Sequence, residues 1–294
     1  MGQVLVLGLV YGVIYSLFAV GIVLVYRGSG TINFAQGEIG TFGLFVAWWF
    51  TTAHHLPWII GAVAALVMAA ALGAGFEWAI VSHMVEANRV SVAVATIGLL
   101  AFLVAFEVRF FEGGNIRKMV APIRGTGWSV FGVVVSPTQI LSLLAAGALA
   151  AGLALLLKKT DFGLGVLAAA QDPVAVRLVG IPLARVSAFV WGLGAAVSVL
   201  GALFIEPTIG VFTPGFASEM FIKGLAAAVV GGLTSLEGAF VGGLLIGFVE
   251  VGANRVFDFP GVKMFSILFV MLLVLLVKPD GLMEGFKFRR RALA

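Results

Sequence analysis

The sequence contains few charged residues for its length and no cysteine. Of its 294 residues 61% are hydrophobic and only 11% are charged, whereas a soluble domain carries roughly 25% charged residues. So few charges cannot coat a water-facing surface of this size, which excludes a soluble enzyme, a nucleic-acid-binding protein and a disordered protein. The absence of cysteine excludes a disulfide framework, a thiolate metal site and a cysteine nucleophile. The mean hydropathy of +1.14 instead predicts a polytopic integral membrane protein.

Sequence motifs that carry common chemistry are absent as well. The chain has no GxxxxGKS or GxxxxGKT phosphate loop, no HExxH and no GxSxG. The three histidines, His54, His55 and His83, lie near the ends of hydrophobic segments, where we expect interfacial positions and not a metal site. We therefore predict that this chain is not an enzyme and holds no cofactor or metal of its own.

Nine hydrophobic segments are candidates for membrane helices, since about 20 apolar residues cross the hydrocarbon layer. We predict an all-α bundle of about eight or nine transmembrane helices in one domain, residues 1–294. The first segment lacks a basic region and a cleavage site, so we expect a retained helix and not a signal peptide. The seventh and eighth form either two tight spans or one broken, partly re-entrant helix. The segments are Gly2–Tyr26, Glu38–Ala53, Pro57–His83, Ser91–Phe111, Pro137–Leu157, Ala184–Ile205, Ser218–Val230, Gly238–Ala253 and Val262–Val277.

Lysine and arginine gather in two polar segments, the connection from about 158 to 185 and the tail 278–294. Short loops that are rich in these residues stay in the cytoplasm. With nine crossings both segments fall on the cytoplasmic side, together with Arg27 and Arg89, and the N-terminus lies outside. An even number of crossings would break this assignment.

Charged side chains within membrane segments are costly, and each is therefore a candidate for function. Most of them lie near the end of a segment, from which a side chain can reach the interface, and we expect none at the middle of a long span. Glu219 and Lys223 are four residues apart on one helical face, which favours a structural ion pair over contact with a solute. The candidates are Glu38, Glu77, Glu107, Arg109, Glu219, Lys223 and Glu250.

Glycines recur at the GxxxG spacing, which lets two membrane helices approach closely. The pairs are Gly8/Gly12, Gly238/Gly242 and Gly243/Gly247. We expect them to pack helices within the chain, with a contact between subunits as the alternative.

Two polar segments are candidates for functional parts of the protein. Arg27–Gly40 is rich in glycine and follows an uninterrupted hydrophobic helix. It is either an ordinary cytoplasmic turn or a short re-entrant piece that lines a pathway, because polar backbone at membrane depth is tolerated only inside protein or along a cavity.

The second segment, residues 158–185, contains a helix start. Asp172-Pro173 is typical of such a start. We predict a short helix from Pro173 to about Val179 that stops at Gly180 and docks in a partner's groove, with the lipid headgroups as the alternative.

Four motifs in order resemble one family, the LivH-type permease subunits of bacterial branched-chain amino acid ABC importers. Ile32–Glu38 (INFAQGE) is similar to the family's INFAHGE signature, with glutamine at 36 where histidine is usual. Ala168–Ile181 resembles its coupling segment. Phe221–Glu250 is close to its most diagnostic stretch, and Lys278–Leu282 (KPDGL) resembles its usual ending.

The resemblance implies a multi-pass protein of the bacterial inner membrane, in contact with lipid but not with nucleic acid. It implies a LivM-like second permease, two cytoplasmic ABC ATPases that bind ATP and magnesium, and a periplasmic solute-binding protein. The solute would be a branched-chain amino acid, or urea, an amide or an aromatic acid, moved by alternating access. The expected contacts to the ATPase are Ala170, Gln171, Asp172, Ala175, Arg177 and Gly180, and the expected solute-path residues are Asn33, Gln36, Glu38, Thr234 and Ser235.

A second hypothesis keeps the same fold but needs no motor. In it the chain acts alone, as an ion-gradient-driven carrier or a facilitative channel for a small polar solute.

Overall fold

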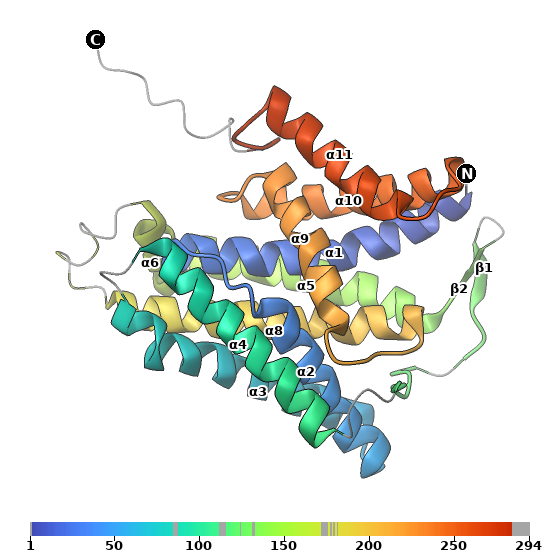
Figure 1. Cartoon of the computed structure of the whole chain (residues 1–294), viewed down its shortest axis with the longest axis horizontal. Helices are drawn as coiled ribbons and strands as arrows, with labels where there is room; N and C mark the ends of the chain where they lie inside the picture. The colour runs from blue at the N-terminus through green and yellow to red at the C-terminus, as the bar shows by residue number, and fades with distance from the viewer. Residues whose placement is uncertain are drawn as a thin grey trace.

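The computed structural model describes residues 2–84, 88–111, 116–123, 125–130, 133–171, 176, 178, 180 and 182–283. It is a bundle of helices with one short antiparallel hairpin, β1 (Trp128–Val130) and β2 (Val133–Val135) (Figure 1). The helices are α1 (Gly2–Ser29), α2 (Gln36–Trp48), a π-helical turn η1 (Trp49–Ala53), α3 (Trp58–Ala79), a 3-10 turn η2 (Val81–Met84), α4 (Arg89–Phe110), α5 (Pro137–Lys159), α6 (Asp161–Gln171), α8 (Leu183–Ile209), α9 (Phe216–Gly231), α10 (Leu236–Val256) and α11 (Val262–Val277).

All nine hydrophobic segments are helical, which confirms the all-α class. Among the described residues six helices are long and apolar enough to cross a membrane: α1, α3 with its 3-10 extension, α4, α5, α8 and α10. The other three segments form shorter helices, since α2 has 13 residues and α9 and α11 have 16 each. The expected eight or nine spans are therefore six long helices and three short ones.

Local sequence signals set several helix boundaries. Ser136 accepts a hydrogen bond from the backbone N–H of Gln139, whose side chain accepts one from the backbone N–H of Ser136. This capping box starts α5 at Pro137. The end of α8 is set by Gly210, which has a φ of 90°. In this left-handed conformation glycine carries no Cβ penalty.

The glycines of α1 and α10 form a seam in which the two helices touch backbone to backbone. A Cβ atom at Gly247 would overlap the backbone of Gly12, and one at Gly243 would overlap Ser16. A Cβ atom at Gly8 would instead overlap the ring of Phe248 on α10. The GxxxG pairs therefore pack helices within the chain, as predicted.

A separate apolar cluster closes one end of the bundle. It joins the end of α1 (Leu24, Val25) to the end of α5, to α6 and to the start of α8. Arg27, Arg89, Lys159 and Arg185 flank these elements and therefore lie at this end. The N-terminus and the β1–β2 hairpin lie at the opposite end (Figure 1). This distribution agrees with the grouping of basic residues that the sequence predicts.

Candidate functional site

The chain turns back into the bundle directly after α1. A Cβ atom at Gly21 would contact the side-chain nitrogen of Gln36, the first residue of α2. Gly21 lies eight residues before the end of α1 at Ser29, which is about 12 Å along the helix axis at a rise of about 1.5 Å per residue. Asn33, Gln36 and Glu38 are at most 1% exposed. The segment is therefore a re-entrant piece inside the protein and not an exposed turn.

Helix α2 supplies the cap for the N-terminus of α9. One carboxylate oxygen of Glu38 accepts a hydrogen bond from the backbone N–H of Gly215 at 2.9 Å, and the other accepts one from the Ser218 hydroxyl at 2.8 Å. The Thr41 hydroxyl accepts a third, from the backbone N–H of Ala217 at 2.9 Å. The first N–H groups of a helix have no partner within the helix, and a carboxylate there is also favoured by the helix dipole.

The C-terminal end of α9 is held by the last motif of the chain. Backbone N–H groups of Leu282 and Met283 donate to the carbonyls of Val230 and Gly231 at 2.9 and 3.2 Å. Beside this contact, Gly231 and Gly238 bring α9 and α10 so close that a Cβ atom on either would overlap the other's backbone. With 16 residues, α9 is about 24 Å long, shorter than a hydrocarbon core of about 30 Å, and protein groups satisfy both of its ends.

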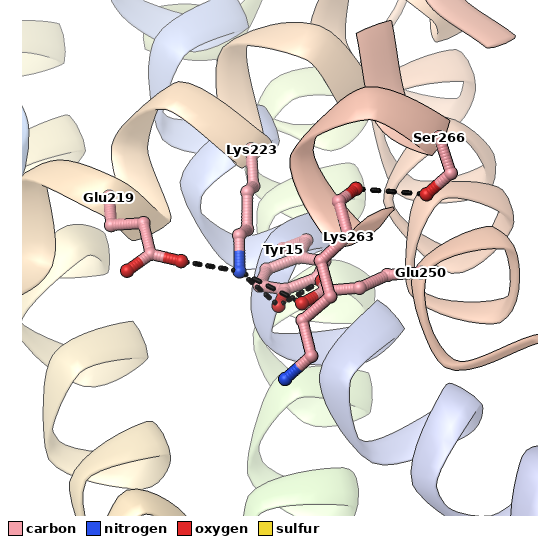
Figure 2. Close-up of polar contacts among 6 residues, drawn as sticks. All are labelled: Tyr15, Glu219, Lys223, Glu250, Lys263 and Ser266. Atoms are coloured by element: carbon pink, nitrogen blue, oxygen red, sulfur yellow. Dashed lines mark hydrogen bonds and ion pairs between the residues drawn. The ribbon is translucent and has the colours of Figure 1, made fainter. Parts of the chain in front are cut away.

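An ionic network joins α1, α9 and α10 (Figure 2). The ammonium group of Lys223 lies 2.8 Å from Glu219 and 2.9 Å from Glu250, and the Tyr15 hydroxyl donates to Glu250 at 2.6 Å. The side chains of Lys223 and Glu250 are 5% and 6% exposed, whereas that of Glu219 is 59% exposed. The predicted pairing of Glu219 with Lys223 is confirmed.

The position of this network qualifies one expectation from the sequence. Tyr15 occupies the middle of the 28-residue helix α1, so the charged groups of Lys223 and Glu250 lie beside the middle of a long span, although neither residue is itself at the middle of one. Sequence reasoning missed Tyr15 and the link from Lys223 to Glu250. The available signal was Tyr11 and Tyr15, two of only three tyrosines, one helical turn apart in an apolar span.

Other charged candidates lie apart from this network. Glu77 on α3 is 3% exposed, and Glu107 on α4 is fully buried and lies within electrostatic reach of Glu38. Arg109 is exposed and places its guanidinium 5.6 Å from the ring of Phe110.

The expected solute-path residues fall into two places. Asn33 accepts a hydrogen bond from the backbone N–H of Ala35, whereas the amide of Gln36 has no hydrogen-bond partner among the described residues. Thr234 is exposed in the turn between α9 and α10, and Ser235 caps α10 by accepting from the backbone N–H of Gly238. The first group lies around the start of α2 and the second in the turn between α9 and α10, and their shared role in a path remains a prediction.

The expected coupling residues are described in part. Ala170 and Gln171 are the last residues of α6, a helix that was not predicted from the sequence. The hydroxyl of Thr160 accepts a hydrogen bond from the backbone N–H of Gly163 and so helps to start this helix. Asp172, Ala175 and Arg177 lie outside the described residues. Val176 and Leu178 are helical, and Gly180 has a φ of 82°, the left-handed conformation expected of a helix end.

Taken together, the six long apolar helices and the shorter helices packed against them define a multi-pass membrane protein. The family model of the branched-chain amino acid transport system permease component matches residues 4–277. The chain belongs to this family, and with its apolar helices this makes it a protein of the inner membrane. The high-affinity branched-chain amino acid transport system permease protein BraD of Pseudomonas aeruginosa is 30% identical over 96% of this chain and 95% of its own length. LivH of Escherichia coli K12 is 28% identical over 94% and 93%.

A solved structure shares the fold. PsaBC from Streptococcus pneumoniae in complex with Fab aligns with a TM-score of 0.52 at 12% identity, over 95% of this chain and 93% of the other. At this identity the likeness concerns the arrangement of helices alone.

Proposed function

We propose that this chain is one of the membrane-spanning permease subunits of a bacterial ABC importer and moves a branched-chain amino acid by alternating access. The match of the permease-component family over residues 4–277 carries this proposal. The names of the relatives BraD and LivH supply the solute class. In this proposal a LivM-like second permease completes the path, and a periplasmic binding protein delivers the solute.

The motor lies on other chains, because the sequence has no phosphate loop. Two cytoplasmic ATPases bind ATP and magnesium and push on the segment from about 158 to 185. Two observations support this contact. The segment packs against the ends of α1, α5 and the start of α8, so a push on it reaches several long helices, and Leu178 is 84% exposed there.

Reconstitution in liposomes tests the proposal against a stand-alone carrier. We expect ATP-dependent uptake of L-leucine only when the second permease, the ATPases and the binding protein are present. Uptake by the purified chain alone, without ATP, would favour the carrier.

Bulky substitutions test the coupling role. We expect Asp172→Trp and Arg177→Trp to insert normally but to separate ATP hydrolysis from uptake. Normal uptake with unchanged ATP hydrolysis in both variants would show that the coupling assignment is wrong. Leu144→Trp on the exposed face of α5 is the control for a bulky substitution that leaves coupling intact.

A further inference from the structure

One narrow stripe of α9 is exposed at two positions and partly exposed at the others, and it carries a carboxylate. Its residues recur at a spacing of three or four, whereas the neighbouring positions on the other faces of α9 are buried. Ile222 on this stripe is 50% exposed, and the side chain of Glu219 is 59% exposed. The stripe consists of Ser218, Glu219, Ile222, Leu225 and Val229.

The depth of this stripe excludes lipid as its surroundings. Lys223, one turn from Glu219, bonds to Tyr15 in the middle of α1. A carboxylate that faces hydrocarbon near the bilayer centre is costly, and such residues face a bundle interior or a water-filled cavity. Glu219 reaches the network from the side opposite to Tyr15 and Glu250 (Figure 2). The stripe must therefore face water or another subunit.

The charge of the network is concentrated on its exposed member. The formal charges of Glu219, Lys223 and Glu250 sum to minus one. Glu250 is buried and already receives both the ammonium of Lys223 and the hydroxyl of Tyr15. Lys263 of α11 is drawn beside the network in Figure 2, but in the described part of the chain no ion pair joins it to these groups. The excess negative charge thus lies at Glu219, where it favours a cationic group.

We propose that this stripe of α9 lines the water-filled solute path of the assembled transporter and that Glu219 contacts the ammonium group of an amino-acid solute in transit. The choice of an amino acid rests on the proposed function. Lys223 remains bonded to Glu219 when the solute is absent, so it competes with the solute's ammonium and keeps the contact weak. A weak contact suits transit, because tight binding at this point would slow release.

Cysteine accessibility tests whether the stripe faces water. Because the chain has no cysteine, Ile222→Cys introduces a single reactive thiol, and Leu272→Cys on α11, 54% exposed, is the matched control. In permeabilised vesicles that hold the complete importer, with and without ATP, we expect a charged methanethiosulfonate reagent to add its mass to Ile222→Cys and not to Leu272→Cys. No addition at Ile222→Cys in either state would mean that a subunit or lipid covers the stripe, which overturns the proposal.

A comparison of two reagents tests the charge. The trimethylammonium reagent should gain over the sulfonate reagent at Ile222→Cys because of Glu219. We expect Glu219→Gln to lower the rate of the trimethylammonium reagent about fivefold, the effect of one charge at short range in water, and to raise that of the sulfonate reagent, so that the ratio of the two rates falls by more than fivefold. An unchanged ratio would show that Glu219 does not act on cations in the path.

Uptake of L-leucine by the complete importer tests the solute contact. With the binding protein saturating, we expect Glu219→Gln to slow uptake about tenfold, the loss of one charge-assisted hydrogen bond, and Glu219→Asp to restore part of it. If the wild type takes up L-leucine and Glu219→Gln is equally fast, this inference fails while the proposed function stands. If the wild type takes up no amino acid, the proposed function fails, and the labelling result still decides whether the stripe lines a path.

Discussion

Helix α1 is held by its neighbours in two different ways. Against α10 it presents glycines, and the two backbones touch at Gly12 and Gly247. Near its middle it presents the hydroxyl of Tyr15 to Glu250 and Lys223. The first contact consists mainly of close backbone packing, with one hydrogen bond from the Ser16 hydroxyl to the carbonyl of Phe240 at 2.7 Å, whereas the second consists of directed bonds between charged and polar groups.

The difference predicts that the glycine seam between α1 and α10 is rigid, whereas the contacts around Lys223 can rearrange. Lipid gives no hydrophobic drive for helix association, so close packing and interhelical hydrogen bonds hold membrane helices together. A glycine seam leaves no room for any change of side-chain position. An ion network can exchange partners, and its outermost member, Glu219, is exposed. We therefore expect the α1–α10 seam to persist through transport, whereas the contacts around Lys223 can change.

The largest effect should come from a side chain in the seam. Gly247→Leu puts four carbon atoms where a single Cβ already overlaps the backbone of Gly12, so α1 and α10 must separate. We expect a loss of about 3 kcal/mol or more, at the upper end for overpacked cores, seen as a lower Tm and poor recovery of folded protein by size-exclusion chromatography.

The same helix provides the control for this substitution. A Cβ atom at Gly252 would meet only one side-chain atom of Val4, at 3.9 Å, so Gly252→Leu should fold normally. Equal recovery of the two variants would show that the backbone contact does not hold α1 to α10.

A somewhat smaller effect should follow from breaking the network. Glu250→Leu leaves the buried ammonium of Lys223 with the exposed Glu219 as its ion-pair partner and with the Tyr15 hydroxyl, and it removes the acceptor of that hydroxyl. Removal of one member of a buried ion pair costs about 3 kcal/mol or slightly more, and the remaining pair with Glu219 should hold the loss to about 2–3 kcal/mol. Thermal unfolding in detergent measures it.

A double variant sharpens this prediction. Lys223→Met with Glu250→Leu removes both buried charges, and we expect it to unfold at a higher temperature than Glu250→Leu alone. Glu219→Gln alone should cost less than about 1 kcal/mol because Glu219 is exposed. The losses of Lys223→Met and Glu250→Leu are also measured singly. If the double variant lost the sum of these two, Lys223 and Glu250 would not act as a pair.

The helices could be predicted from the sequence because each depends on a local run of apolar residues. All nine hydrophobic segments are helical, and the last, Val262–Val277, has the predicted bounds. The GxxxG pairs were also predictable as close contacts, since glycine at that spacing leaves a groove on any helix. Helix α6 was not predicted, because the segment is too polar to span a membrane and the helix start recognised in it was Asp172-Pro173, which follows α6.

The site could be predicted only as separate pieces. Glu38 and Ser218 are 180 residues apart, and Lys223 and Glu250 are 27 apart on different helices. No spacing in a single sequence encodes such a contact. The structure nonetheless brings three of the four recognised motifs to α9: Ile32–Glu38 caps its start, Phe221–Glu250 contains most of it, and Lys278–Leu282 reaches its end. These three motifs therefore meet at one helix, a contact that only the fold shows.

The smallest predicted effect concerns the cap that α2 places on α9. Thr41→Val keeps the shape of the side chain but removes the acceptor for the backbone N–H of Ala217. Loss of a helix cap costs about 1 kcal/mol, which should leave the fold intact and loosen only the first turn of α9. Hydrogen–deuterium exchange measures this directly, and we expect faster exchange in peptides that cover residues 215–220.

A matched variant shows whether the effect is local. Ser235→Ala removes the corresponding cap of α10 and should speed exchange around residues 236–240 but not around 215–220. Because Lys223 lies six residues further along α9 than the capped Ala217, more than one turn away, Thr41→Val should also leave the Lys223–Glu250 contact and the Tm nearly unchanged. Unchanged exchange at 215–220 in Thr41→Val would mean that Glu38 alone holds the start of α9, and Glu38→Gln should then produce the loss that Thr41→Val does not.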